Sequence, residues 1–213
     1  MGNVTRRAVV VATAGAGLLA VSAPALRANE AHAEMSLKDA LERRRSTRAF
    51  TDAHVDEASL ESLLWSAMGV NRPESGGRTA PSWHTSYGTD IYVADHAGVR
   101  RFDPVAGVLT PTLSEDIRSR TSPEPFVGTA PTVLVYVADL GRMYKAPREE
   151  QVQAAHVDAG IVAQNVYLYC ASAGLGTCLV GGADKAGLTT LLKLPEAQVV
   201  TFVQPVGHPK QPA

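Results

Sequence analysis

The stretch Arg43-Arg44-Arg45-Ser46-Thr47-Arg48-Ala49-Phe50 gathers four guanidinium groups and a serine hydroxyl within six residues. An arginine side chain ends in a planar fork that binds two phosphate oxygens at once, and a serine adds a short donor. The stretch is therefore a candidate phosphate site. A solvent-exposed basic turn has the same composition, so these residues alone leave both interpretations open.

Helical patterns lie on both sides of this stretch. Ser36, with Asp39 three residues later, is typical of a helix N-cap, and the short helix after it leads into the arginines. A second helix is predicted to begin at Asp56 and to end at Gly69, because apolar residues recur at helical spacing between them. Residues 71–77 are predicted to form a loop.

The rest of the chain alternates strands with one long helix. Residues 151–173 are apolar on most sides, so this helix is expected to be buried against a partner subunit as well as its own sheet. Short helices are expected from Ser114 and from Asp184 to Leu192. Strands are predicted at residues 89–94, 99–102, 131–138 and 199–206.

The first 33 residues have the features of an export signal. Arg6 and Arg7 precede an uncharged apolar run, and Ala31 and Ala33 fit a cleavage site after Ala33. The paired arginines favour the twin-arginine type, with an ordinary secretory signal and an uncleaved anchor as alternatives. We therefore expect a signal over residues 1–33 and one domain over residues 34–213. The protein would be bacterial and periplasmic or secreted, or cytoplasmic if residues 1–33 are not a signal.

The composition is that of an ordinary globular domain, with 213 residues of which 45% are hydrophobic. Without residues 1–33, 17 basic side chains face 20 acidic ones, and this net charge of −3 argues against nucleic acid as a partner. After removal of the signal we expect no membrane contact, and no metal-binding spacing is present. Cys170 and Cys178 fit small buried side chains better than a disulfide, although export would permit one.

Four short segments together resemble the FMN-dependent nitroreductase family. Residues 44–50 match its signature R-R-S-x-R-x-F, and the other matches are residues 78–82, residues 164–168 with 174–182, and residues 205–209. They occur in the family's order and span nearly the whole chain after about residue 36. The resemblance implies an α+β, nitroreductase-like fold, in which helices flank a central, mostly antiparallel sheet and two chains intertwine as a homodimer.

The resemblance also implies which residues would hold FMN. Arg44, Ser46 and Arg48 would bind the phosphate, with Arg45 nearby through its main chain. In the family, a basic residue near the C-terminus helps to hold the phosphate. Lys210 is the candidate for this role, and the alternative is that it is a charge in the tail with no role. Glycines let a backbone approach a flat ring closely. The ring would therefore lie along the backbone of Leu179, Val180, Gly181 and Gly182, where many relatives have a glutamate at position 181.

In this family the loop at residues 81–87 comes from the other subunit and contacts the flavin. Here Thr85 replaces the usual asparagine and Tyr87 replaces the usual glutamine. Two alternatives remain: Trp83 packs in the core, and His84 is an ordinary surface residue. The cofactor-binding candidates in this loop are Pro81, Ser82, Trp83 and Thr85, and the substrate-facing candidates are His84, Tyr87 and, from another segment, Phe126.

No serine triad, zinc motif or nucleotide-binding loop is evident, which is consistent with chemistry supplied by a flavin. The first hypothesis is an FMN-dependent oxidoreductase that reduces a small acceptor such as a nitroaromatic or a quinone, with NAD(P)H as a candidate donor. The second is a SagB-type dehydrogenase that oxidises azoline-like rings without NAD(P)H, because nicotinamides are scarce outside the cytoplasm. The third is a flavin-binding protein without turnover, for which the replacements at positions 85, 87 and 181 argue.

Overall fold

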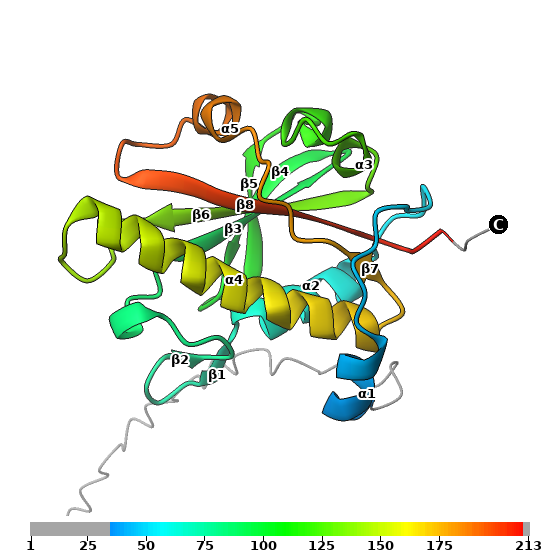
Figure 1. Cartoon of the computed structure of the whole chain (residues 1–213), viewed down its shortest axis with the longest axis horizontal. Helices are drawn as coiled ribbons and strands as arrows, with labels where there is room; N and C mark the ends of the chain where they lie inside the picture. The colour runs from blue at the N-terminus through cyan, green and yellow to red at the C-terminus, as the bar shows by residue number, and fades with distance from the viewer. Residues whose placement is uncertain (1–34, 211–213) are drawn as a thin grey trace, which may run out of the picture.

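The computed structural model describes residues 35–210, so the predicted signal over residues 1–33 lies outside the described residues. Its centre is a six-stranded sheet in the order β5-β4-β3-β6-β8-β7, in which all neighbouring strands run antiparallel (Figure 1). The predicted strands are confirmed to within one residue at their ends. The strands of the sheet are β3 (Thr89–Asp95), β4 (Gly98–Asp103), β5 (Val108–Leu113), β6 (Thr132–Asp139), β7 (Gly176–Thr177) and β8 (Gln198–Gly207).

Helices begin where polar side chains cap them. The Ser36 hydroxyl accepts from the Asp39 N–H at 3.1 Å, and the Asp56 carboxylate accepts from the Ser59 N–H at 2.9 Å, so both predicted caps are confirmed. Asp184 caps the last helix in the same way. The helices are α1 (Leu37–Arg43), α2 (Glu57–Met68), α3 (Pro125–Gly128), α4 (Arg148–Ser172) and α5 (Lys185–Leu191).

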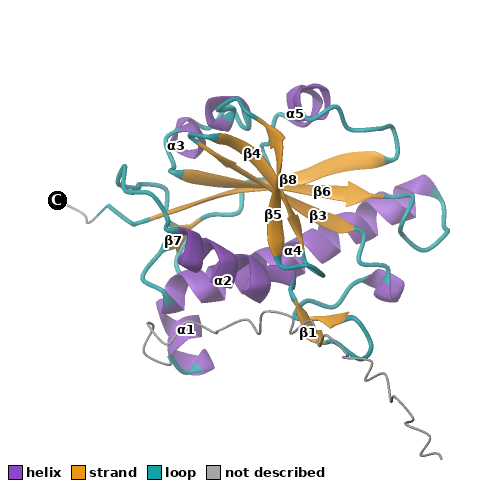
Figure 2. Ribbon diagram, turned by 180° about the vertical axis from the view of Figure 1, so that it is seen from behind, coloured by secondary structure: helices purple, strands orange, loops and turns teal. Residues whose placement is uncertain are grey.

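The sheet has a core on each face. Helices α1, α2 and α4 lie on one side of it, and α3 and α5 lie on the other (Figure 2). Strand β6 is buried on both faces, which matches its nearly continuous apolar sequence. Its Leu134 and Tyr136 join the core under α2 and α4, whereas Val133 and Val135 join the core that includes Leu188 of α5.

The long helix α4 is buried only in part within one chain. Its inner residues, such as Ala159, Ala163 and Val166, are fully buried against the sheet. On the outer side, however, Val157 is 57% exposed. A single chain therefore does not meet the expectation of burial all round, because Val157 still faces outward.

Two local predictions were wrong. Residues 71–77 are not a plain loop, because β1 (Val70–Arg72) and β2 (Gly77–Arg78) form a small antiparallel hairpin there. No helix starts at Ser114; instead the Asp116 carboxylate accepts from the Arg118 N–H at 3.1 Å, and only a short 3-10 turn (Arg118–Arg120) follows. A side chain that bonds its own backbone two residues later competes with helix formation.

Strand β5 was not predicted, because it contains Pro111 and is mostly exposed. It is an edge strand of the sheet, where the missing N–H of a proline is tolerated. Both cysteines are buried and free, as expected from the sequence. Over residues 35–210, no helix has the length and apolar character needed to cross a membrane.

Candidate functional site

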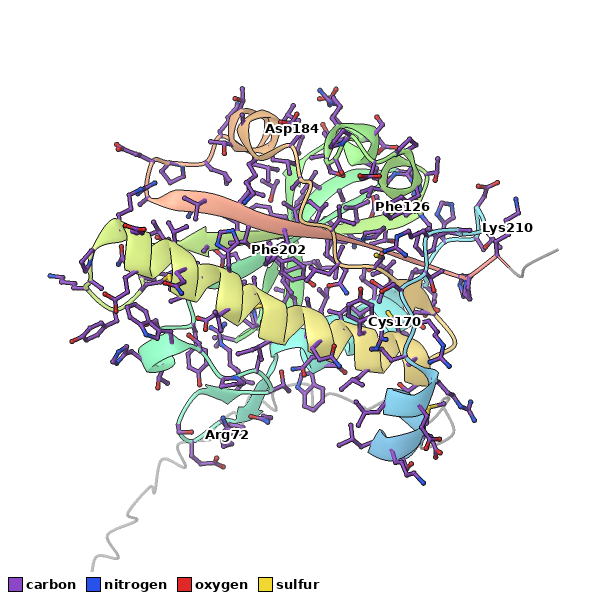
Figure 3. All side chains as sticks on the ribbon, viewed as in Figure 1. Arg72, Phe126, Cys170, Asp184, Phe202 and Lys210 are labelled. Atoms are coloured by element: carbon purple, nitrogen blue, oxygen red, sulfur yellow. The ribbon has the colours of Figure 1, made fainter. Side chains whose placement is uncertain are left out.

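The arginine segment, residues 43–50, is fixed by backbone pairing in its middle and at its end. In the middle, Ser46 pairs with Thr177 of β7, and the Thr47 N–H donates to the Thr177 carbonyl at 2.8 Å. At its end, the Lys210 N–H donates to the Ala49 carbonyl at 2.9 Å. Lys210 therefore lies beside the arginines at one end of the molecule, with Phe126 toward the same end (Figure 3).

The side chains of the arginine segment do different things. The Arg44 guanidinium lies over the Tyr167 ring, 5.3 Å from its centre, and the Arg48 guanidinium lies 6.0 Å from the centre of the Phe126 ring. The Arg45 guanidinium instead folds back and donates to the carbonyl of Arg44 at 2.9 Å. Within residues 35–210, no carboxylate forms an ion pair with Arg44 or Arg48, so both positive charges remain available to an anion.

Tyr167 connects the arginine segment to the glycine-rich segment. Its hydroxyl lies 3.2 Å from the Ser46 hydroxyl, and it also accepts from the Leu179 N–H at 2.8 Å. Val180 then exchanges two backbone hydrogen bonds with Val203 of β8. The backbone at Leu179 and Val180 is therefore fixed in position, and Tyr167 connects it to Ser46.

The glycines of this segment leave free space beside a fixed backbone. The Gly182 carbonyl accepts from the Ser122 hydroxyl at 2.7 Å. A Cβ atom built on Gly181 or Gly182 would meet no atom within 4 Å. A flat ring can approach such a backbone closely, and the two uncompensated guanidiniums suit a phosphate. These residues therefore fit FMN at both its ring and its phosphate.

The 81–87 loop has a strained backbone. His84, Thr85 and Tyr87 have φ values of 48°, 56° and 49°, which lie in the left-handed region. Each such residue costs about 1–2 kcal/mol compared with a relaxed backbone. Strain of this kind persists only where other contacts hold the chain, and it is often found at functional sites.

Aromatic side chains gather at the same loop. His84 stacks on Tyr144 with ring centres 4.0 Å apart, and Trp83 meets Tyr144 edge-on at 5.5 Å. Trp83 is half-buried and packs on a small apolar cluster, so it contributes to the core although it belongs to the loop. The Arg78 guanidinium lies 4.6 Å from the Tyr87 ring centre, and burial lowers the pKa of Arg78.

Asp158 of α4 lies under this loop. Its carboxylate accepts from the Trp83 N–H at 2.9 Å, and only 4% of the residue is exposed. Burial raises the pKa of Asp158, while hydrogen bonds from Trp83 and Ser82 act in the opposite direction. A hollow of about 410 Å³ opens between the loop and α4, with Pro81, Trp83 and Val157 among its lining residues.

One chain does not bring all the predicted residues together. The phosphate and ring candidates lie mainly on the two segments that contact Tyr167 through Ser46 and Leu179, whereas the 81–87 loop meets α4 near Asp158. At 1.5 Å per residue, these two points on α4 are about 14 Å apart along the helix axis. The first group comprises Arg44, Arg45, Ser46, Arg48, Phe126, Leu179, Val180, Gly181, Gly182 and Lys210, and the second comprises Pro81, Ser82, Trp83, His84, Thr85 and Tyr87.

Sequence reasoning missed three residues of these two places. Tyr167 was noted only as part of a motif, and Tyr144 and Asp158 were not singled out. Each acts through a contact with a residue distant in sequence: Tyr167 with Ser46, Tyr144 with His84, and Asp158 with Trp83. A polar residue on the apolar helix at residues 151–173 was the available signal for Asp158, because a buried carboxylate needs donors.

Comparison with known proteins gives a consistent result. The Nitroreductase family matches residues 41–208. A protein of Methanocaldococcus jannaschii that is named as a nitroreductase is 30% identical over 82% of this chain and 92% of its own length. The FMN reductase (NADPH) of Bacillus subtilis is 25% identical over 78% of this chain and 62% of its own length.

Among solved structures, a crystal structure of a protein from Ralstonia eutropha JMP134, also named as a nitroreductase, superposes with a TM-score of 0.80. The two sequences are 40% identical, and the match covers 84% of this chain and 86% of the other. The six-stranded antiparallel sheet with flanking helices is therefore a known arrangement.

Proposed function

Because this chain belongs to the nitroreductase family, we propose that its arginine segment and its glycine-rich backbone hold the FMN of an oxidoreductase that acts on small organic acceptors. FMN dependence and oxidoreductase activity belong to the family. The observation that carries the proposal is the pairing of two uncompensated guanidiniums, Arg44 and Arg48, with the open backbone at Gly181 and Gly182.

The phosphate end would be bound by charge and by short donors. Arg44 and Arg48 supply charge-assisted hydrogen bonds, each contributing about 1.5–3 kcal/mol, and Ser46 supplies a hydroxyl. Lys210 adds a further positive charge, since its backbone pairs with Ala49. The Arg45 side chain has no such role, because its guanidinium is engaged by backbone carbonyls.

We further propose that the site is completed by a second copy of the chain. Val157 on α4 remains exposed and lines the hollow together with Ile161, and burial of such apolar side chains favours association. If two α4 helices pack antiparallel, the 81–87 loop of one chain approaches the phosphate site of the other. This pairing would bridge the distance between Asp158 and Tyr167 that separates the two groups within one chain.

When bound, FMN would supply the redox chemistry, which is the transfer of a hydride equivalent from a reduced donor to an oxidised acceptor. The residues of the chain bind, orient and tune it. Backbone N–H groups near Gly181 and Gly182 offer donors toward the ring, and the cations at Arg44 and Arg48 favour negative charge nearby. We propose NAD(P)H as the donor and a nitroaromatic or a quinone as the acceptor.

Purified protein tests this proposal directly. It should be yellow, release FMN on denaturation and behave as a dimer by sedimentation. Anaerobic addition of NADH or NADPH should bleach the flavin, and a nitroaromatic or quinone should restore the colour. Bleaching by dithionite but by neither nucleotide would contradict NAD(P)H as donor and favour the azoline-oxidising alternative. Protein that stays colourless after refolding with FMN would refute the proposal.

Two arginine variants test the phosphate site. Arg48→Ala should weaken FMN binding roughly tenfold or more, because it removes a charge-assisted contact. Arg45→Ala is the matched control, since it removes an equal charge whose donors face the chain's own carbonyls. Equal FMN affinity in both variants would contradict the assignment of Arg48.

A further inference from the structure

Asp158 is a buried carboxylate to which the flavin chemistry assigns no role. Within residues 35–210, no cation forms an ion pair with it. Its hydrogen-bond donors come from one place, the 81–87 loop. The Trp83 N–H donates to its two oxygens at 2.9 and 3.2 Å, and the nearby Ser82 hydroxyl acts to lower its pKa. A carboxylate held out of water without a cation depends on such donors.

Ser82 extends this contact to the far end of the loop. Its hydroxyl oxygen accepts from the Tyr87 N–H at 2.8 Å. Asp158 therefore holds the loop at Trp83, and Ser82, the residue before Trp83, holds it at Tyr87. The three left-handed residues lie between or at these anchored points. Because a left-handed backbone relaxes unless it is held, these hydrogen bonds help to fix the loop's shape.

A second set of contacts holds the middle of the loop but does not reach α4. The Ser86 hydroxyl donates to the Trp83 carbonyl at 2.7 Å and accepts from the Tyr144 N–H at 3.0 Å. Tyr144 precedes α4 and is itself exposed. Asp158, in contrast, lies within the long helix Arg148–Ser172, so it offers a fixed reference point.

We infer that Asp158 is the positioning residue that holds the 81–87 loop in its strained conformation and so presents the loop to the flavin bound by the partner subunit. The presentation to a flavin rests on the proposed function. The anchoring of the loop concerns the flavin-free chain alone, so the two parts are tested separately.

The chain contains its own reporter of the anchoring. Trp65 and Trp83 are its two tryptophans, so Trp65→Phe leaves Trp83 as the single source of tryptophan fluorescence. In this background and without FMN, Asp158→Ala should raise the acrylamide quenching of Trp83 severalfold. The loss of a charged hydrogen bond shifts the loop roughly tenfold toward released conformations. Asp158→Asn should restore much of the shielding, because its amide oxygen still accepts from the Trp83 N–H.

The second measurement is hydrogen exchange over residues 82–87. Ser82→Ala should speed exchange at the Tyr87 amide while Trp83 stays shielded, since it removes only the acceptor of the Tyr87 N–H. If Asp158→Ala does not fold, exchange at the Trp83 amide of the parent protein decides the matter, because this N–H donates to Asp158 and rapid exchange there would overturn the inference. A folded Asp158→Ala protein with unchanged quenching and unchanged exchange would overturn the inference.

A matched control separates anchoring from the general loss of a carboxylate. Asp103 also accepts from backbone N–H groups, of Val105 and Ala106, but in the turn between β4 and β5. Asp103→Asn should leave the quenching of Trp83 and the FMN affinity as in the parent protein.

Protein loaded with FMN tests whether the loop is presented to the flavin. Asp158→Ala should shift the visible absorption band of bound FMN and weaken FMN binding roughly tenfold. A released loop with an unchanged FMN spectrum and affinity would overturn the presentation to the flavin. If the parent protein itself binds no FMN, the proposed function fails, while the quenching and exchange data still test the anchoring.

Discussion

The free space beside Gly182 gives a sharp prediction, because it separates binding from stability. Gly182→Val adds an isopropyl group where a built Cβ meets no atom within 4 Å. The Gly182 backbone does not have a positive φ, so the valine causes no left-handed strain. The stability of the flavin-free protein should therefore change by no more than about 0.5 kcal/mol.

The same substitution should strongly affect the cofactor. If the flavin ring occupies this space, the added group overfills it at a cost of about 1–3 kcal/mol. At about 1.4 kcal/mol for each tenfold change, FMN would bind roughly 5-fold to 150-fold more weakly. The assay is a titration of flavin-free protein with FMN, followed by the quenching of flavin fluorescence, beside thermal unfolding without FMN.

Gly176, in contrast to Gly182, lies at a crowded position. A Cβ on Gly176 would lie 2.7 Å from the Thr47 methyl carbon, so Gly176→Ala should destabilise the flavin-free protein by about 1–3 kcal/mol. Unchanged FMN affinity in Gly182→Val would refute the placement of the ring. So would a marked loss of stability in that variant, because the space would then not be free.

Three further predictions follow from single contacts. Tyr167→Phe removes the acceptor of the Leu179 N–H, so FMN should bind about fivefold more weakly by calorimetry; unchanged affinity would exclude this role. Tyr136→Phe leaves the buried Gln204 oxygen without its donor, so urea unfolding should show about 1–3 kcal/mol less stability, with FMN affinity retained. A hydrogen bond with Arg118 lowers the pKa of Asp116, so the Asp116 carboxylate stabilises the fold above its unfolded pKa of about 3.9 and loses that effect as the pH falls. Asp116→Asn should therefore make the urea midpoint less sensitive to acid, and equal sensitivity would contradict the pairing.

Local signals in the sequence predicted most of the fold. Ser36 and Asp56 cap their helices because each needs only donors within the next three residues. Strand β6 was recognised because burial on both faces demands a continuous apolar run. Strand β5 was missed for the opposite reason: it is exposed, contains Pro111 and is defined by pairing with β4, which no local pattern records.

The candidate site was recognised from the sequence where it follows a linear motif. The arginine segment and the segment ending at Gly182 are short and contiguous, so their sequences resemble a family signature. The contacts that hold them are not contiguous. Tyr167 reaches Ser46, and Asp158 reaches Trp83, across large sequence separations that only the folded chain reveals. The role of such residues depends on packing and could not be read from spacing.

The pairing of Lys210 with Ala49 has a consequence for how the protein is made. The Phe50 strand bridge to Pro209 and the hydrogen bond from Lys210 join the beginning of the domain to the final described residues. During synthesis, the arginines leave the ribosome long before their backbone partners exist. The arginine segment therefore gains these partners only after the last strand has been translated, so a flavin bound there as we propose would be loaded late, after synthesis of the chain.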